Sequence, residues 1–239
     1  MTGGAPLGAS FDPDRISALR PAPGGGSGPG APAGRPRFTA GRSWARAAVL
    51  MAAFVVLLYS IESVDSIIDY CIDCTAGIEP RVVHGLDGIL FAPLLHGGWD
   101  HLIGNTLPVL ILGFLTLATG IGRGLAATAI VWIVAGLGTW LTGGANSVHI
   151  GASSLVFGWL TYLICRGWFA RRIGQIVLGL VVLAFYGSLL WGVLPGQDGI
   201  SWQGHLFGAM GGLIAGWVLS SDERRHRRQL RTGTSVPTR

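Results

Sequence analysis

The sequence predicts an all-α membrane protein with six transmembrane helices, and three observations support this fold class. Half of the 239 residues are hydrophobic, and the mean hydropathy is +0.53. Only 12% of the residues are charged, against about 25% in a typical soluble domain. The apolar residues also gather into six stretches that approach the ~20 residues needed to cross a bilayer. These features exclude a soluble enzyme, a coiled coil and a disordered regulator.

The chain divides into three parts by composition. Residues 1–42 are rich in Gly, Pro and Ala and lack any apolar period. They are predicted to form a disordered tail, because such a segment cannot offset its ordering entropy by burial. Residues 43–221 hold the apolar stretches and are predicted to form the membrane domain. Residues 222–239 contain a run of arginines and are predicted to be a basic cytoplasmic tail.

The six expected spans are apolar segments punctuated by glycines, which membrane helices tolerate better than soluble helices do. They cover residues 44–64, 102–121, 125–142, 151–168, 173–194 and 205–220. The apolar segment 86–95 is too short to cross and is predicted to be an interfacial or re-entrant element.

The distribution of arginine orients these spans. Arginines precede the first span, lie near residues 123 and 166–172, and follow the last span, whereas the opposite loops hold most of the acidic residues. Because arginine favours the cytoplasmic side, both termini are predicted to be cytoplasmic. All 17 basic residues are arginine, and this bias with abundant Ala and Gly favours a bacterial plasma membrane.

Polar and ionisable side chains within membrane spans are costly and mark functional sites. His101 and Asn105 open the second span, Ser153 opens the fourth and His205 opens the sixth. With the N-terminus inside, these three spans all run from outside to inside. We therefore expect the four side chains to lie at the same depth, near the outer surface.

Small residues predict a close approach between the sixth span and a neighbour. From His205, one helical face continues through Gly208 and Gly212, and small residues at this spacing let membrane helices approach closely. Such an approach would bring His205 to hydrogen-bond distance of a serine. Ser153 follows Gly151 in a turn at a helix start, where backbone N–H groups can hold an oxyanion.

These residues favour acyl transfer. A serine hydroxyl needs an adjacent general base, and histidine is the usual base near neutral pH. No acidic residue lies within the span near His205, so we predict a dyad with Ser153 rather than a triad. Candidate oxyanion donors are the Asn105 amide, the His101 ring and the Ser153 backbone N–H. No cofactor or metal is expected, because water supplies the second nucleophile.

At these residues the chain resembles the rhomboid family of intramembrane serine proteases, which have a six-helix core. The family pattern places a histidine five residues before a second histidine and an asparagine four residues after it. A Gly-x-Ser turn then opens the fourth helix, and the sixth helix has a histidine with glycines three and seven residues later. The matching residues are His96, His101, Asn105, Gly151, Ser153, His205, Gly208 and Gly212.

The resemblance implies a role for each residue of the site. It implies Ser153 as nucleophile, His205 as general base, and His101 with Asn105 as oxyanion ligands. It also implies that Phe157 packs against the catalytic histidine. Two departures stand out: Ser154 occupies the position where the family usually has glycine, and the Trp-Arg pair that many members carry in the first outer loop is not evident.

The resemblance predicts an endopeptidase that cleaves peptide bonds in or near transmembrane helices of other membrane proteins. A helix shields its carbonyls, so substrates with Gly, Ala, Ser or Pro near the outer end of a span are expected. The alternative is a non-catalytic pseudoprotease that binds client helices, although it would typically lose Ser153 or His205. A small transporter is disfavoured, because neither internal inverted repeats nor paired polar sites at mid-membrane are visible.

The remaining chemistry-bearing residues have simpler interpretations. Nucleic acid is not an expected partner, because no basic surface with interleaved aromatic residues is present. The two histidines of the family pattern lack the spacing of a zinc protease motif. Cys71 and Cys74 lie in the outer loop, where they either form a disulfide or remain thiols. His84 and His149 have no evident partner and are interpreted as loop histidines.

Overall fold

The computed structural model describes residues 40–68, 71–197 and 199–232, with side chains from 42 to 221. Six long helices in this part overlap the six expected spans. They are α2 (Ala40–Ile67), α5 (Trp99–Ala118), α6 (Ile121–Thr142), α7 (Ser153–Ala170), α8 (Ile173–Tyr186) with its 3₁₀ continuation η3 (Gly187–Val193), and α9 (Trp202–Thr232). Four short segments lie between α2 and α5, namely α3 (Ile72–Thr75), η1 (Val83–Leu86), α4 (Gly88–Phe91) and η2 (Ala92–Leu94).

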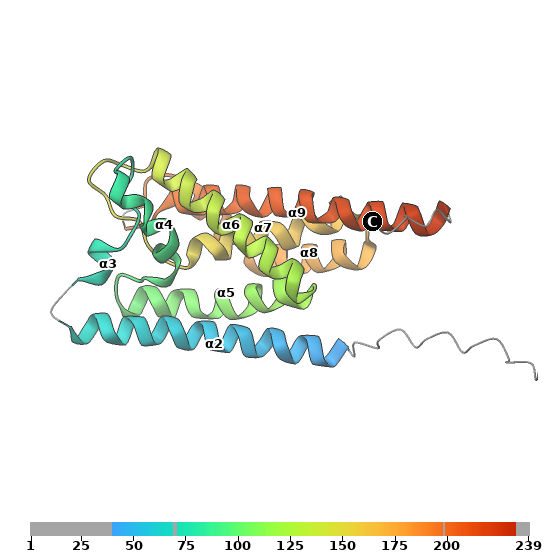
Figure 1. Cartoon of the computed structure of the whole chain (residues 1–239), viewed down its shortest axis with the longest axis horizontal. Helices are drawn as coiled ribbons and strands as arrows, with labels where there is room; N and C mark the ends of the chain where they lie inside the picture. The colour runs from blue at the N-terminus through green and yellow to red at the C-terminus, as the bar shows by residue number, and fades with distance from the viewer. Residues whose placement is uncertain (1–39, 69–70, 198, 233–239) are drawn as a thin grey trace, which may run out of the picture. The chain divides into compact units, whose positions relative to one another are not determined.

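Helix α7 lies at the centre of the bundle and contacts α5, α6, α8 and α9 (Figure 1). Most of its residues are buried on every side of the helix, which is typical of a helix enclosed by protein. Trp159 Nε1 donates to Thr128 Oγ1 on α6 at 2.9 Å, and Thr161 Oγ1 donates to the Ala209 carbonyl on α9 at 2.8 Å. These bonds help to fix α7 against two of its neighbours.

Four of the described helices are long and apolar enough to cross a membrane: α2, α5, α6, and α8 with η3. Only 22% of the apolar window in α2 is buried, and only 11% of that in α8 with η3. Such exposed apolar faces suit lipid rather than water. Helices α7 and α9 are not among the four, because they carry more polar residues and glycine. The fold is that of a helical membrane protein.

An arginine of the loop between α2 and α5 contacts the end of α6. Arg81 has a positive φ of 62°. Its Nη1 atom donates to the carbonyl oxygens of Gly143 at 2.7 Å and Leu141 at 3.3 Å. The last carbonyls of a helix lack intrahelical partners, and a cation there also opposes the negative end of the helix dipole. The arginine therefore stabilises the C-terminal end of α6.

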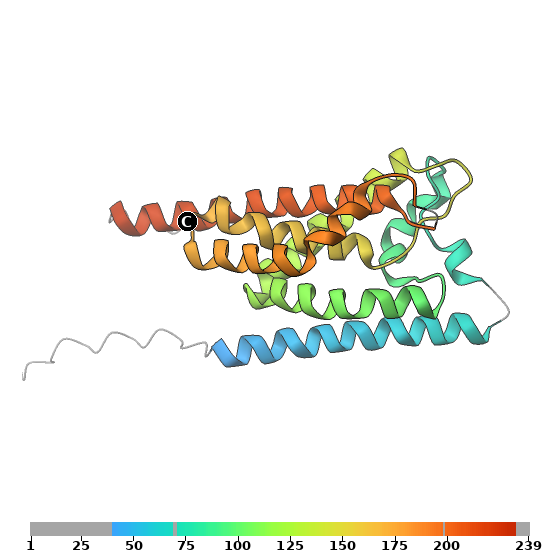
Figure 2. The ribbon, with the colours of Figure 1, turned by 180° about the vertical axis from the view of Figure 1, so that it is seen from behind.

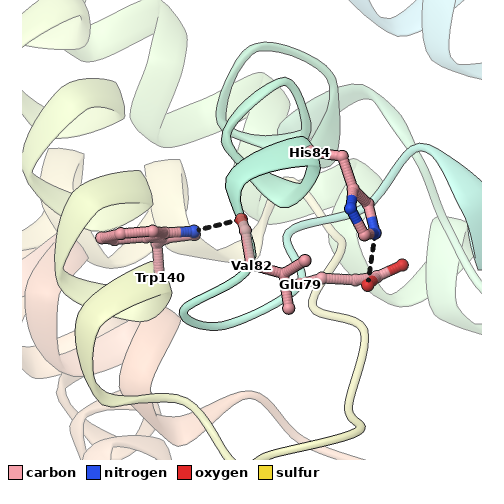
Figure 3. A network of polar contacts seen from close by, with 4 residues as sticks. All are labelled: Glu79, Val82, His84 and Trp140. Carbon is pink, nitrogen blue, oxygen red and sulfur yellow. Dashed lines mark hydrogen bonds and ion pairs between the residues drawn. The ribbon is translucent and has the colours of Figure 1, made fainter.

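The same loop is held by a tryptophan of α6. Figure 3 shows Trp140 Nε1 donating to the Val82 carbonyl at 2.9 Å, beside the contact of His84 with Glu79. The His84 Nε2 and Glu79 Oε2 atoms are 3.0 Å apart, and the imidazole is exposed. His84 thus lies in the short 3₁₀ helix η1, rather than in an irregular loop, and has a local acidic partner.

Several boundaries differ from those expected. Helix α2 begins at Ala40, within the segment predicted to be a tail, and the backbone of α9 continues as a helix to Thr232. Residues 1–39 and 233–239 of the two predicted tails lie outside the described residues.

The short apolar segment 86–95 forms α4, η2 and the end of η1, none of which is long enough to cross a bilayer. Cys71 and Cys74 form a disulfide.

Candidate active site

The starts of α5, α7 and α9 lie at the same end of the bundle, which also holds α3 and α4 (Figures 1 and 2). His101 lies in the first turn of α5, Ser153 is the first residue of α7, and His205 is in the first turn of α9. The parallel direction of the three helices therefore brings these positions to one end of the bundle.

The serine and the histidine are in direct contact. Ser153 Oγ and His205 Nε2 are 2.8 Å apart, which is hydrogen-bond distance. The Phe157 ring stacks on the His205 ring, with centroids 4.0 Å apart and planes 9° from parallel. Phe157 lies one helical turn after Ser153, so α7 supplies both the hydroxyl and the apolar surface against which the imidazole rests. This stacking restricts rotation of the imidazole away from the hydroxyl.

The Nδ1 atom of His205 has a backbone partner that the sequence does not predict. It lies 2.9 Å from the carbonyl oxygen of Gly192, near the end of η3. Carbonyls at the end of a helix lack intrahelical partners and can accept other donors. The Nδ1–H group of the neutral ring donates to this carbonyl. The Nε2 atom then carries the lone pair, which faces Ser153. The backbone therefore occupies the place where a catalytic triad has a carboxylate.

Glycines bring α9 close to α7. A Cβ atom on Gly208 would overlap the carbonyl oxygen of Ser154, and one on Gly212 would overlap the carbonyl oxygen of Gly158 and Oγ1 of Thr161. Only residues without side chains allow this backbone approach. The predicted role of Gly208 and Gly212 in close packing is consistent with these contacts, and the approach brings His205 within reach of Ser153.

A third glycine makes room for His101. Gly151 has a positive φ of 114°, and a Cβ atom there would lie 2.9 Å from both Cε1 and Nε2 of the His101 ring. The Gly97 backbone N–H donates to His101 Nδ1 at 3.4 Å. Because Nδ1 accepts this bond, the proton of the neutral ring lies on Nε2, which faces the turn before Ser153. His101 is thereby able to donate into the site.

Asn105 lies one turn after His101 and shares its face of α5. The side chain is buried with 8% exposure, and its Nδ2 atom donates to the His101 carbonyl at 3.0 Å. An amide nitrogen carries two protons, so this bond orients the group and leaves a second proton for another acceptor. The Asn105 amide is therefore fixed in orientation and still has one N–H group that can donate to another acceptor.

His96 packs behind these groups. It lies before the start of α5, is 2% exposed, and contacts the His101 ring edge-on with centroids 5.1 Å apart. The Ala152 N–H, in the turn before Ser153, points to His96 Nε2 at 3.5 Å. Burial, and to a lesser degree the neighbouring His101, lowers the pKa of His96 to about 4. The ring is therefore neutral at neutral pH and supports the turn as an acceptor.

The two adjacent serines differ in their surroundings. Ser153 lines a cavity of about 890 Å³, together with His101, Asn105 and His205. Ser154 is not among the residues that line this cavity, although both serines line a smaller cavity of about 20 Å³ beside α6. This arrangement distinguishes Ser153 from Ser154 as the serine that faces the open site.

Among the described residues, one group of possible metal ligands lies close together, namely Cys71, Asp73 and Cys74. The two sulfurs are joined in a disulfide, so neither can bind a metal as a thiolate. None of the three residues lines the cavity around Ser153.

Comparison with known proteins agrees with the resemblance inferred from the residues. The Rhomboid domain family matches residues 84–222. The uncharacterized protein Rv1337 of Mycobacterium tuberculosis is 46% identical over 215 residues, covering 84% of this chain and 89% of the relative. The uncharacterized protein ML1171 of Mycobacterium leprae is 43% identical over 202 residues, covering 81% and 80%. Rhomboid-like protein 11, chloroplastic, of Arabidopsis thaliana is 33% identical over 144 residues, covering 54% and 51%. The match extends over more than half of the chain and includes every residue of the site described above, so the chain belongs to the rhomboid family.

Proposed function

We propose that the protein is an intramembrane serine endopeptidase that cleaves peptide bonds in or near transmembrane helices of other membrane proteins. The observation that carries this proposal is the 2.8 Å contact between Ser153 Oγ and His205 Nε2 at the edge of the large cavity. Ser153 is the nucleophile and His205 the general base. A non-catalytic member that binds client helices would have no need of this contact.

The proposed topology has all six long helices crossing the bilayer, with both termini in the cytoplasm of a bacterial cell. Arg123 lies in the first turn of α6, and Arg171 and Arg172 lie between α7 and α8. These arginines favour the cytoplasmic side. Helices α7 and α9 cross despite their polar residues, because protein rather than lipid surrounds much of their surface.

In the first half of the proposed reaction, Ser153 Oγ attacks the carbonyl carbon of the scissile peptide bond while its proton passes to His205 Nε2. The imidazolium that forms keeps its Nδ1 proton on the Gly192 carbonyl. The carbonyl oxygen becomes an oxyanion, which accepts hydrogen bonds from the Asn105 amide, His101 Nε2–H and the Ser153 backbone N–H.

The tetrahedral intermediate then collapses. The C–N bond breaks as His205 Nε2–H protonates the amine leaving group, and an acyl-serine ester remains. Water, deprotonated by His205, attacks this ester and releases the second product as a carboxylic acid while Ser153 recovers its proton. The balance requires only water, so no cofactor takes part in the proposal.

The cavity favours an extended substrate segment. Its walls include apolar side chains from α7 and η3, such as Val156, Leu189 and Trp191. A peptide carbonyl within an α-helix is already hydrogen-bonded and enclosed by its own turn. Gly and Pro are the least favourable residues within a helix, and Ser is less favourable than Ala. We propose substrates with Gly, Pro or Ser, or the small residue Ala, near the outer end of a span as the substrate class.

A serine-reactive fluorophosphonate tests the proposal. The purified wild-type protein in detergent is expected to be labelled, whereas Ser153→Ala is not. Reconstitution with a panel of single-span proteins then identifies substrates cleaved by the wild type alone. Equal labelling of the two proteins, or no labelling of the wild type, would contradict the enzymatic function and favour client binding.

Removal of the proposed oxyanion donor on α5 is expected to slow turnover. Loss of one such donor typically reduces kcat by about 10²–10³-fold, so we expect Asn105→Ala to fall in this range with a nearly unchanged KM. Steady-state cleavage kinetics in proteoliposomes provide the measurement. Labelling of Asn105→Ala by a probe whose binding is driven by its apolar tail should fall less than kcat does. A normal kcat in Asn105→Ala would remove this residue from the mechanism.

A further inference from the structure

His149, interpreted from sequence as a loop histidine, has two side-chain partners in the structure. Its Nδ1 atom lies 2.7 Å from Ser201 Oγ, and its Nε2 atom lies 2.9 Å from Ser147 Oγ. Its backbone pairs with Ile78 of the first outer loop through two hydrogen bonds of 3.0 Å. Its main chain and its ring are therefore both held in place.

Ser201 immediately precedes α9, which begins at Trp202. Its Oγ atom accepts the Gly204 N–H at 3.2 Å, and its carbonyl oxygen accepts the His205 N–H at 3.1 Å. These are the bonds of an N-cap, which satisfies backbone donors that would otherwise lack partners. The position of Ser201 therefore sets the position of the helical turn that carries His205.

The hydrogen bonds around His149 form a chain in which every group is satisfied. Ser201 Oγ accepts from Gly204 N–H, so its own proton can be donated to His149 Nδ1. The Nε2 proton is then donated to Ser147 Oγ, and the Ser147 hydroxyl donates to the Gly144 carbonyl at 2.7 Å. This chain requires a neutral imidazole, and burial lowers the pKa of His149. At neutral pH the ring is therefore in the required form.

The bond from His149 to Ser201 is a second connection between the two segments that carry the dyad. His149 lies four residues before Ser153, and Ser201 lies four residues before His205. The 2.7 Å contact joins the loop before α7 to the start of α9, and the 2.8 Å contact joins the first turns of the same helices. Neither His149 nor Ser201 gains or loses a proton in the proposed reaction, so their contact persists through it.

We propose that His149 is a positioning residue that holds the start of α9, through Ser201, against the loop before α7 and so keeps His205 within reach of Ser153. This inference rests on the proposed function. A small displacement of a catalytic group is enough to reduce a rate by about 10²-fold. The link acts on the distance between base and nucleophile, so we expect its loss to lower kcat. Because His149 and Ser201 also line the large cavity, KM is measured beside kcat to separate positioning from substrate binding.

Two amide variants separate the two partners of the ring. In His149→Asn the side-chain amide falls near the position of Nδ1 and retains a bond to Ser201. In His149→Gln the amide falls near Nε2 and retains the bond to Ser147 instead. We expect His149→Gln to lower kcat by about 10–10²-fold with KM within about threefold. His149→Asn and the control Ser147→Ala are expected to keep kcat within about threefold of the wild type.

Amide hydrogen exchange of residues 199–206, measured in the Ser153→Ala background, provides a readout that needs no catalysis. His149→Gln is expected to increase exchange in this segment at least about threefold, whereas His149→Asn leaves it near the starting rate. Unchanged exchange in His149→Gln would overturn the inference, and so would equal kcat values for the Asn and Gln variants. An inactive wild type would contradict the proposed function, while hydrogen exchange would still test the link.

Discussion

Ser153→Ala is expected to lower the rate of substrate cleavage by more than about 10⁴-fold, because removal of the proposed nucleophile leaves only binding and oxyanion stabilisation. Ser154→Ala is expected to remain within about threefold of the wild type. The difference follows from geometry: Ser153 Oγ contacts His205 and Ser153 lines the large cavity, whereas Ser154 is not among the residues that line it. Initial cleavage rates in proteoliposomes, at matched protein amounts, provide the comparison.

The pair of variants also addresses the departure from the family pattern. If Ser154 were the nucleophile, the two results would be exchanged. Ser154→Gly restores the residue that the family usually has and is expected to cleave at a rate similar to that of Ser154→Ala. A large gain in Ser154→Gly would instead mean that the hydroxymethyl group obstructs the oxyanion site. Circular dichroism and elution volume check that each variant retains the fold.

The sequence is most informative where a physical pattern is local. The six long helices overlap the expected spans because each is a continuous apolar segment with few charges. Their shared direction then places the polar residues at the starts of α5, α7 and α9 at one end of the bundle. The glycine spacing on α9 similarly predicts close packing, which the contacts of Gly208 and Gly212 with α7 support.

Contacts that depend on tertiary placement have no comparable signal. The carbonyl of Gly192 becomes a partner of His205 because α8 passes into the 3₁₀ helix η3, and apolar composition does not distinguish these two forms. His149 and Ser201 are separated by more than fifty residues, and each lies in a loop with no periodic pattern. The position of α7 at the centre of the bundle likewise follows from its packing against α5, α6, α8 and α9, which the hydropathy of its own sequence does not predict.

Gly212→Ala is expected to destabilise the protein by about 1–3 kcal/mol, as overpacking typically does. The added Cβ atom would overlap the Gly158 carbonyl oxygen, which is backbone, and Thr161 Oγ1, which is held by its hydrogen bond to the Ala209 carbonyl. Relief requires α9 to move away from α7, which also weakens the bond of Thr161 to the Ala209 carbonyl. We expect a lower midpoint of thermal unfolding in detergent together with slower cleavage.

Gly216→Ala is the matched control, because it lies one turn further along the same helix. A Cβ atom there would lie 3.5 Å from Phe169 Cδ2 and 3.7 Å from the Arg166 backbone nitrogen, which are ordinary contacts. Since alanine is favoured over glycine within helices by up to ~1 kcal/mol, this variant is expected to be as stable as the wild type or more stable, with unchanged cleavage. Opposite signs of the two stability changes would show that close approach, rather than helix propensity, selects glycine at position 212. Equal destabilisation by both substitutions would contradict that explanation. It would also contradict the claim that close packing of α9 on α7 brings His205 to Ser153.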